Sequence, residues 1–284
     1  MLKAMSIGAY TFLTQNWRQL EYPADLWIQH NSKCFDELAL FTYGKINLGK
    51  DLPENVKIVE GPKLDTSDFS GFRFYTYAKT KAMEALTTKW KVILESDEFI
   101  TKRIDTSNFN RFFSYPLGFI QLYGNISTEI KSAFLVYLYR IHYGNKKIIG
   151  DGGPRPPYSG KINFNGIGNL IQRKVFRRHL EDYYPIWTTN KIENWAYHTN
   201  CLRSPEIMSD KWIRQMKREI EAGIKKSYYN EWLSDILSRP FEYSRYKEFW
   251  PDSYLRNVNP PDVLLKNASR FIKVQFDPDE YVDK

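Results

Sequence analysis

Short apolar segments alternate with turns and helical sequence over residues 5–94, and this alternation limits the folds that the chain can adopt. Four segments have the length and the residue types of buried strands: Met5–Leu13, Phe35–Tyr43, Val56–Val59 and Trp90–Leu94. Strands that alternate with helices build a sheet that is mostly parallel and is covered on both faces. The sequence therefore predicts an α/β fold with a mostly parallel sheet flanked by helices.

Two segments between these strands have helical character. Trp17–His30 can form a helix only in part, because Pro23 interrupts it. Phe74–Thr88 has helical spacing, and we expect one side of this helix to be buried. The side chains on that side are those of Tyr77, Met83, Ala85 and Leu86.

The middle of the chain is less regular. Phe109–Tyr123 has an extended pattern, whereas Ser132–His142 fits either a strand or a helix. Gly150–Pro157 consists mainly of glycine and proline, and we expect it to be a loop.

The sequence changes character again near residue 204. Ser204 is followed by Pro205 at the first helical position and then by a long charged segment, which is typical of a helix. The tail from Asp252 is polar and contains several prolines. We therefore expect one domain over residues 1–203 and a helical C-terminal region with a tail over residues 204–284.

The composition favours a globular protein with anionic partners. Hydrophobic residues make up 42% of the 284 residues, which is enough for a buried core. The net charge of +8 favours phosphate-rich partners such as nucleotide diphosphates or nucleic acid. The two cysteines form no disulfide framework, and no apolar stretch is long enough to cross a membrane. We therefore expect a cytoplasmic protein without a transmembrane segment.

Three acidic residues follow the predicted strand Trp90–Leu94, namely Glu95, Asp97 and Glu98. Because ligands bind beyond the carboxyl ends of parallel strands, we expect these side chains at the functional edge of the sheet. Carboxylate oxygens are the ligands that Mg²⁺ and Mn²⁺ prefer, and a nucleotide diphosphate supplies others. The segment therefore predicts a site for Mn²⁺ or Mg²⁺ together with a diphosphate.

Residues 76–100 resemble the helix and following strand of family 2-type glycosyltransferases, which have the nucleotide-diphospho-sugar transferase fold called GT-A. Members of that family commonly have a helix rich in lysine and alanine, then tryptophan, an apolar run and Asp-x-Asp-Glu. Asp97 matches the last acid of Asp-x-Asp, which contacts the metal, and Glu98 matches the acid that follows. Glu95 stands where the first aspartate is usual, and we expect it to take part in cofactor binding.

A second stretch, Trp195–Lys211, is similar to a segment of some members of that family. There a histidine on a late strand precedes Arg-x-Pro-Glu and a helix that carries lysine. The resemblance implies that His198 completes the metal site or binds the diphosphate. Arg203, near the start of the expected helix, is placed to hold phosphate beside the helix N-terminus.

The resemblance also implies where the donor nucleotide binds. In the family, the first strand and the loop after it hold the base and the ribose, and Tyr10 and Thr11 occupy that region here. We expect Lys79, on the helix before the acidic motif, to reach phosphate. An inverting transferase also needs a general base near the acceptor hydroxyl. The two candidates are Asp182, in a Glu-Asp dipeptide, and Asp151, in the glycine-rich loop.

The sequence thus predicts a metal-dependent glycosyltransferase that moves a sugar from a nucleotide-diphospho-sugar donor to an acceptor hydroxyl. The acceptor is a glycan, a lipid-linked sugar or a modified base in DNA, and the basic charge gives weight to a polyanion. A nucleotidyltransferase is one alternative, although Ser6–Tyr10 is poor in glycine for a phosphate loop. A non-enzymatic nucleic-acid-binding protein is another, although no binding signature is present in the sequence.

Overall fold

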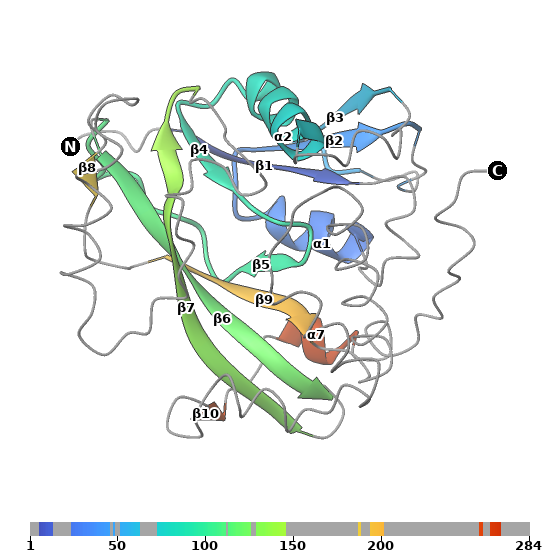
Figure 1. Cartoon of the computed structure of the whole chain (residues 1–284), viewed down its shortest axis with the longest axis vertical. Coiled ribbons are helices and arrows are strands. Elements are labelled where there is room, and N and C mark those ends of the chain that lie inside the picture. The colour runs from blue at the N-terminus through green and yellow to red at the C-terminus, as the bar shows by residue number, and fades with distance from the viewer. Residues whose placement is uncertain are drawn as a thin grey trace, which may run out of the picture.

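The structure is a computed structural model of the whole chain, and it has an α/β fold with a mixed sheet (Figure 1). The residues that it describes are 6–13, 24–45, 48, 52–62, 73–111, 113–125, 129–145, 187–188, 194–201, 256–257 and 262–267. The predicted loop Gly150–Pro157 and the predicted helix after Ser204 lie outside these residues. The α/β class predicted from the alternating pattern is confirmed.

One half of the sheet consists of parallel strands close to the four segments predicted from the sequence. β1 (Ile7–Leu13) pairs in parallel with β2 (Glu37–Tyr43) and with β4 (Trp90–Ile93), and β2 pairs in parallel with β3 (Val56–Gly61). All seven residues of β1 are buried, because this strand has a neighbour on each side and both of its faces are covered. β3 lies at the edge, and its side chains are only partly buried.

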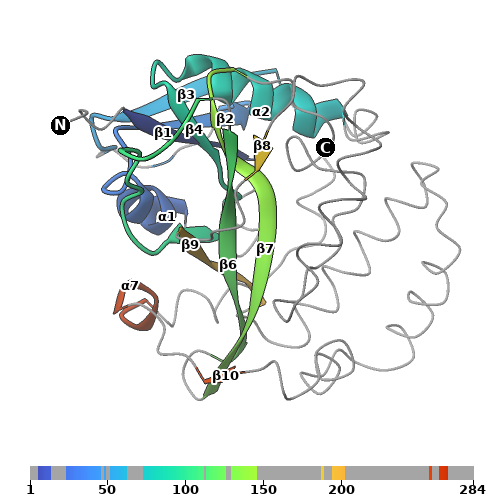
Figure 2. The same cartoon turned by 90° about the vertical axis from the view of Figure 1, so that its left-hand side faces the viewer.

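The other half of the sheet contains longer strands that run steeply across the direction of β1 and β2 (Figures 1 and 2). The antiparallel pair β6 (Phe113–Asn125) and β7 (Glu129–Tyr143) joins the first half through antiparallel pairing of β7 with β4. Ser132–His142, for which the sequence left strand and helix open, lies in β7. β9 (Trp195–Cys201) then pairs with β6, and β5 (Glu98–Ile100) pairs with β9.

The order of the described strands shows how distant segments meet. Along the sheet the order is β3-β2-β1-β4-β7-β6-β9-β5. Two short strands lie off this path: β8 (Trp187–Thr188) pairs with β6, and β10 (Arg256–Asn257) pairs with β7. A short helix, α7 (Asp262–Leu265), adds Leu264 to the core.

Two helices cover opposite faces of the parallel strands (Figure 2). α1 (Ala24–Asn31) begins directly after Pro23 in the sequence, and α2 is Arg73–Ala85. Because side chains alternate along a strand, β1 sends Ile7 and Ala9 into the core that contains α1 and sends Phe12 into the core that contains α2. Each large apolar side chain buried in this way stabilises the fold by about 1.5–3 kcal/mol.

The buried side predicted for the second helix is correct only in part. Met83 and Leu86 are buried, with 2% and 4% of their surface exposed. Tyr77 is 45% exposed, so the prediction that it is buried is wrong. Its ring instead makes an edge contact with Phe41 of β2, with 5.6 Å between the ring centroids, at the margin of the core. Within the described residues, no helix has the length and hydropathy needed to cross a membrane.

Candidate metal centre

The three acidic residues predicted at the functional edge lie in a tight turn at the carboxyl end of β4. The backbone N–H of Glu98 donates to the carbonyl oxygen of Glu95 over 3.1 Å, which closes the turn. The N–H of Glu95 donates in return to Glu98 Oε2 over 2.7 Å. The turn is therefore held by its own backbone and by one of its own carboxylates.

Two side chains of α1 form hydrogen bonds with the end of the same turn. Trp27 Nε1 and Asn31 Nδ2 both donate to the carbonyl oxygen of Glu98, over 2.7 and 3.0 Å. Asn31 Oδ1 also accepts a hydrogen bond from the N–H of Ile100 over 3.0 Å. Because Asn31 is buried and uses both ends of its amide, the position of β5 relative to α1 is fixed.

β9 brings His198 to this turn from a distant part of the chain. The antiparallel register pairs Glu98 of β5 with His198 of β9. One residue further on, Thr199 donates from both its backbone nitrogen and its Oγ1 to the carbonyl oxygen of Asp97, each over 2.9 Å. Hydrogen bonds from β9 therefore hold Asp97, which the sequence predicts to be a metal ligand.

Asp97, Glu98 and His198 form a cluster that suits a divalent cation. One ligand atom from each of the three side chains lies within 4.8 Å of the others. His198 Nε2 is 3.2 Å from Asp97 Oδ2. Two carboxylate oxygens and one imidazole nitrogen are a donor set that fits Mn²⁺ well and Mg²⁺ less well. The structure brings Asp97 and His198 together, and the binding of a metal by them stays a prediction.

Glu98 is the most deeply buried acid of the cluster, with 1% of its surface exposed. Burial raises its pKa to about 7, because the charged form loses its hydration. The positive charge of Arg140 and a charge on His198 act in the opposite direction. Glu98 is therefore a carboxyl group that gains and loses its proton near neutral pH while it lies beside the candidate metal position.

Glu95, at the start of the turn, contacts two cations. Its Oε1 atom lies 2.7 Å from Lys79 Nζ of α2 and 3.4 Å from Arg140 Nη1 of β7. Arg140 Nη2 also lies 3.9 Å from Glu98 Oε1, and the guanidinium carbon lies 5.5 Å from the centroid of the Phe119 ring. The acidic turn thus borders a group of buried positive charges.

Tyr10 and Thr11, predicted to contact the donor nucleotide, are fully buried in β1. The hydroxyl oxygen of Tyr10 lies 2.9 Å from His142 Nε2, and His142 Nδ1 lies 3.0 Å from the carbonyl oxygen of Gly144. A carbonyl oxygen only accepts, so His142 Nδ1 carries the hydrogen and Tyr10 donates to Nε2. Contact of Tyr10 and Thr11 with a nucleotide stays a prediction.

Three further predicted site residues, Arg203, Asp151 and Asp182, lie outside the described residues. Arg140 was not among the site residues predicted from the sequence. Its signal was present, because Arg140 is a charged residue within the apolar run Ser132–Ile141. A charge in such a run is either exposed or held by a buried partner, and here it is held by Glu95 and Glu98.

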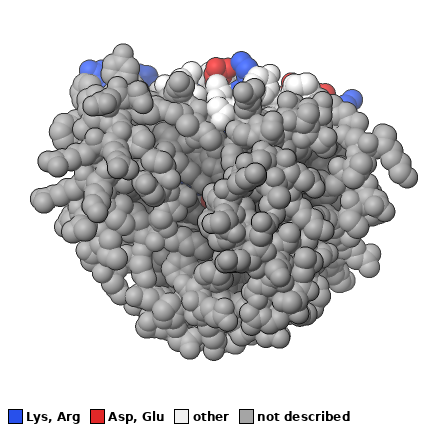
Figure 3. Space-filling model, in the orientation of Figure 1, with Lys and Arg blue, Asp and Glu red and all other residues white. Residues whose placement is uncertain are grey.

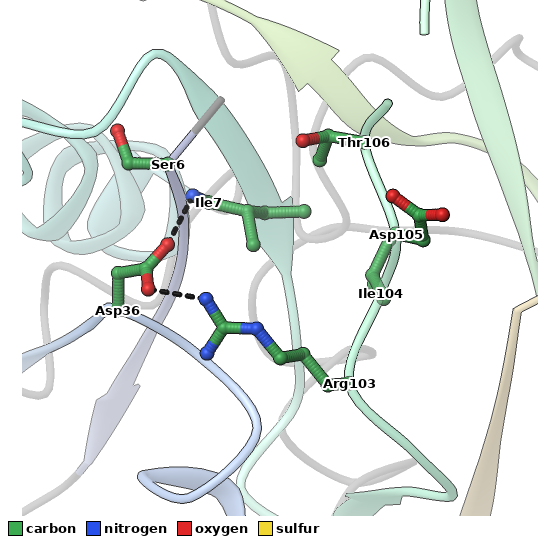
Figure 4. A pocket seen from close by; sticks show the side chains of 7 residues that line it. All are labelled: Ser6, Ile7, Asp36, Arg103, Ile104, Asp105 and Thr106. Carbon is green, nitrogen blue, oxygen red and sulfur yellow. Dashed lines mark hydrogen bonds and ion pairs between the residues drawn. The ribbon is translucent and has the colours of Figure 1, made fainter. Parts of the chain in front are cut away.

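A separate cavity of about 380 Å³ lies at the amino ends of the parallel strands. Figure 4 shows the Arg103 guanidinium directed at Asp36, whose other oxygen accepts a hydrogen bond from the N–H of Ile7 over 2.9 Å. The acidic turn follows the carboxyl end of β4. The cavity and the acidic turn therefore lie at opposite ends of the parallel strands. Ligands of α/β sheets bind at the carboxyl edge, and the acidic turn is therefore the stronger candidate. The residues that line the cavity are Ser6, Ile7, Asp36, Arg103, Ile104, Asp105 and Thr106.

Most of the described charged side chains that Figure 3 shows lie along the upper edge of the view, and both signs occur there. α2 and β3 lie at the same edge in Figure 1. On α2, the exposed residues Lys81 and Glu84 form an ion pair with 2.9 Å between Nζ and Oε2. Described charges along this edge therefore compensate one another in part.

Comparison with known proteins assigns neither a family nor a function to this chain. No protein-family model matches the chain, and no curated protein matches its sequence. A functional proposal therefore depends on the cluster of Asp97, Glu98 and His198 and on the residues around it.

Proposed function

We propose that this protein is a metal-dependent glycosyltransferase with a GT-A-like fold that uses a nucleotide-diphospho-sugar donor. The observation that carries the proposal is the convergence of Asp97 and Glu98, from the acidic turn, and His198, from β9, within 4.8 Å. The place of the cluster, directly after β4 and at the carboxyl edge of the parallel strands, supports it. The resemblance of residues 76–100 to family 2-type glycosyltransferases supports the choice of reaction.

In this proposal, Asp97 and His198 hold Mn²⁺ or Mg²⁺, and Glu98 adds a ligand when it is deprotonated. The cation neutralises charge on the diphosphate when bound. Thr199 and the closed turn hold Asp97 in place, so the ligands are preorganised before the donor arrives.

The reaction joins the acceptor hydroxyl oxygen to the anomeric carbon of the sugar and breaks the bond between that carbon and the diphosphate. The proton of the hydroxyl passes to a general base, for which Asp151 and Asp182 remain the candidates, and the nucleoside diphosphate leaves. A glycan, a lipid-linked sugar and a modified base in DNA remain the candidate acceptors.

A donor screen tests the proposal. The full-length protein is incubated with a panel of nucleotide-diphospho-sugars in Mn²⁺, in Mg²⁺ or in EDTA, and the released nucleotide is identified. Release of a nucleoside diphosphate that depends on the metal is expected for at least one donor. Release of pyrophosphate from nucleoside triphosphates would instead indicate a nucleotidyltransferase, and DNA binding without turnover of any donor would indicate a binding protein. Either result would refute the proposal.

A further inference from the structure

Two buried cations converge on the carboxylate of Glu95 from different elements. Lys79 comes from α2 and Arg140 from β7, and both approach the same oxygen, Oε1. The side chains of Lys79 and Arg140 are 0% and 3% exposed, whereas that of Glu95 is 26% exposed. A buried cation is stable only beside an anion that stays in place, so Glu95 is a fixed counterion of both.

Glu95 is also the first residue of the turn that presents Asp97 and Glu98. Its N–H and its carbonyl oxygen form the two hydrogen bonds to Glu98 that close the turn. Arg140 reaches the same segment again, because its Nη1 atom lies 3.4 Å from the carbonyl oxygen of Ile93. The Glu95 side chain therefore connects the acidic turn to α2 on one side and to β7 on the other.

We propose that Glu95 is a positioning residue, held by Lys79 and Arg140, that fixes the acidic turn beside the divalent cation without being one of its ligands. This inference rests on the proposed function, because it requires a cation at Asp97. An oxygen that accepts two cationic donors has a reduced negative potential, which makes it a poor ligand for a third cation. Lys79 accordingly belongs to the framework of the site, whereas the sequence led us to expect contact with phosphate.

Removal of the Lys79 charge has opposite effects under the two roles of Glu95. If Glu95 is a metal ligand, loss of the neighbouring cation makes the site more negative and tightens Mn²⁺ binding. If Glu95 is a positioning residue, loss of Lys79 releases its carboxylate and loosens the turn, so that Mn²⁺ binding weakens. Lys79→Met removes the ammonium group and keeps an unbranched apolar stem. Lys81→Met is the matched control, because Lys81 lies on the same helix and is exposed.

The experiment measures Mn²⁺ affinity by titration calorimetry on the metal-free full-length protein, with circular dichroism as the check on folding. We expect Lys79→Met to weaken Mn²⁺ binding about tenfold, which is the usual effect of removing a group that orients a metal ligand. Lys81→Met should change the affinity by no more than about twofold, because an exposed charge is screened. Unchanged or tighter binding by Lys79→Met overturns the inference.

A second variant keeps the test decisive if Lys79→Met does not fold. Arg140→Lys keeps the net charge but loses the planar group that spans Ile93, Glu95 and Glu98. We expect weaker Mn²⁺ binding at constant net charge, and an unchanged affinity would refute the inference. Failure of the wild-type protein to bind Mn²⁺ overturns the proposed function and this inference together. Binding by the wild type that neither variant weakens overturns the inference alone.

Discussion

Glu98 Oε2 lies 2.7 Å from the backbone nitrogen of Glu95, so the carboxyl group that braces the acidic turn is also a member of the candidate metal cluster. Its other oxygen, Oε1, lies 3.9 Å from Arg140 Nη2. One group thus links the shape of the turn to the charge of the site. Because Glu98 is buried, its ionisation is costly, and in the proposed metal site a proton and the cation would compete for it.

The affinity for Mn²⁺ is expected to rise as the pH increases through 7. Burial raises the pKa of Glu98 to about 7, and only the deprotonated carboxylate is a good metal ligand. Glu98→Gln should bind Mn²⁺ more weakly and with a flatter dependence on pH, because position 98 no longer titrates. Titration calorimetry between pH 6 and pH 8 measures both profiles. Equally steep profiles for the two proteins would contradict the assignment to Glu98.

The same pKa predicts a pH dependence of folding in the metal-free protein. In the unfolded chain the pKa of Glu98 returns to its ordinary value of 4.5. Between that value and pH 7 the folded state holds a proton that the unfolded state has released, so stability decreases as the pH rises through this window. The contribution of Glu98 is on the order of 3 kcal/mol. Urea unfolding at pH 5 and at pH 7.5 measures the change, and Glu98→Gln should show a smaller one.

Asp97→Asn should abolish Mn²⁺ binding and reduce donor turnover by roughly a thousandfold or more, because a charged metal ligand is replaced by a neutral amide. Glu84→Gln is the control, since it removes one exposed carboxylate from α2, away from the acidic turn. Its turnover should match that of the wild type. Turnover by Asp97→Asn near the wild-type rate, or full wild-type activity in EDTA, would exclude the proposed role of the metal.

The parallel strands and the acidic turn were predictable because their signals are local. Trp90–Leu94 is apolar throughout and is followed at once by acids, and this pattern alone placed Asp97 at the carboxyl edge of the sheet. The contact of Asp97 with His198 spans 101 positions in the sequence. It was expected only through the resemblance of Trp195–Lys211 to a glycosyltransferase segment, since no local pattern specifies which strands pair.

The partners of Arg140 were not predictable from local patterns. Ser132–His142 fits a strand and a helix equally well, and the choice is made by pairing with β4, where Val92 lies opposite Ile141. Only this register brings Arg140 to Glu95. Tyr77 is an error of another kind. Helical spacing predicts which side chains share one side of a helix, but it does not predict how far the core extends beneath that side. The Tyr77 ring contacts Phe41 of β2, and the residue remains 45% exposed.

The hydrogen bonds of Asn31 predict that Asn31→Leu destabilises the fold by about 1–3 kcal/mol, because leucine is similar in size but leaves the N–H of Ile100 buried without its acceptor. Amide hydrogen exchange at Ile100 should become faster, since this N–H loses the acceptor that Asn31 provides. Gln29→Leu is the control on the same helix, because Gln29 is exposed. An equal loss of stability in the two variants would show that the hydrogen bonds of Asn31 are not the cause.

At Gly118, β6 approaches β9 closely. A Cβ atom at this position would overlap the ring of Trp195, while the N–H of Gly118 donates to the carbonyl oxygen of Asn194 over 2.9 Å. Gly118→Ala should therefore force the strands apart and cost about 1–3 kcal/mol of stability. Because β9 carries His198, Mn²⁺ affinity should fall as well. Adding Trp195→Leu removes the overlapping ring, so the double variant should be more stable than the sum of the two single changes predicts. Thermal unfolding and Mn²⁺ titration of all three variants measure this, and purely additive losses would show that the ring is not the obstacle.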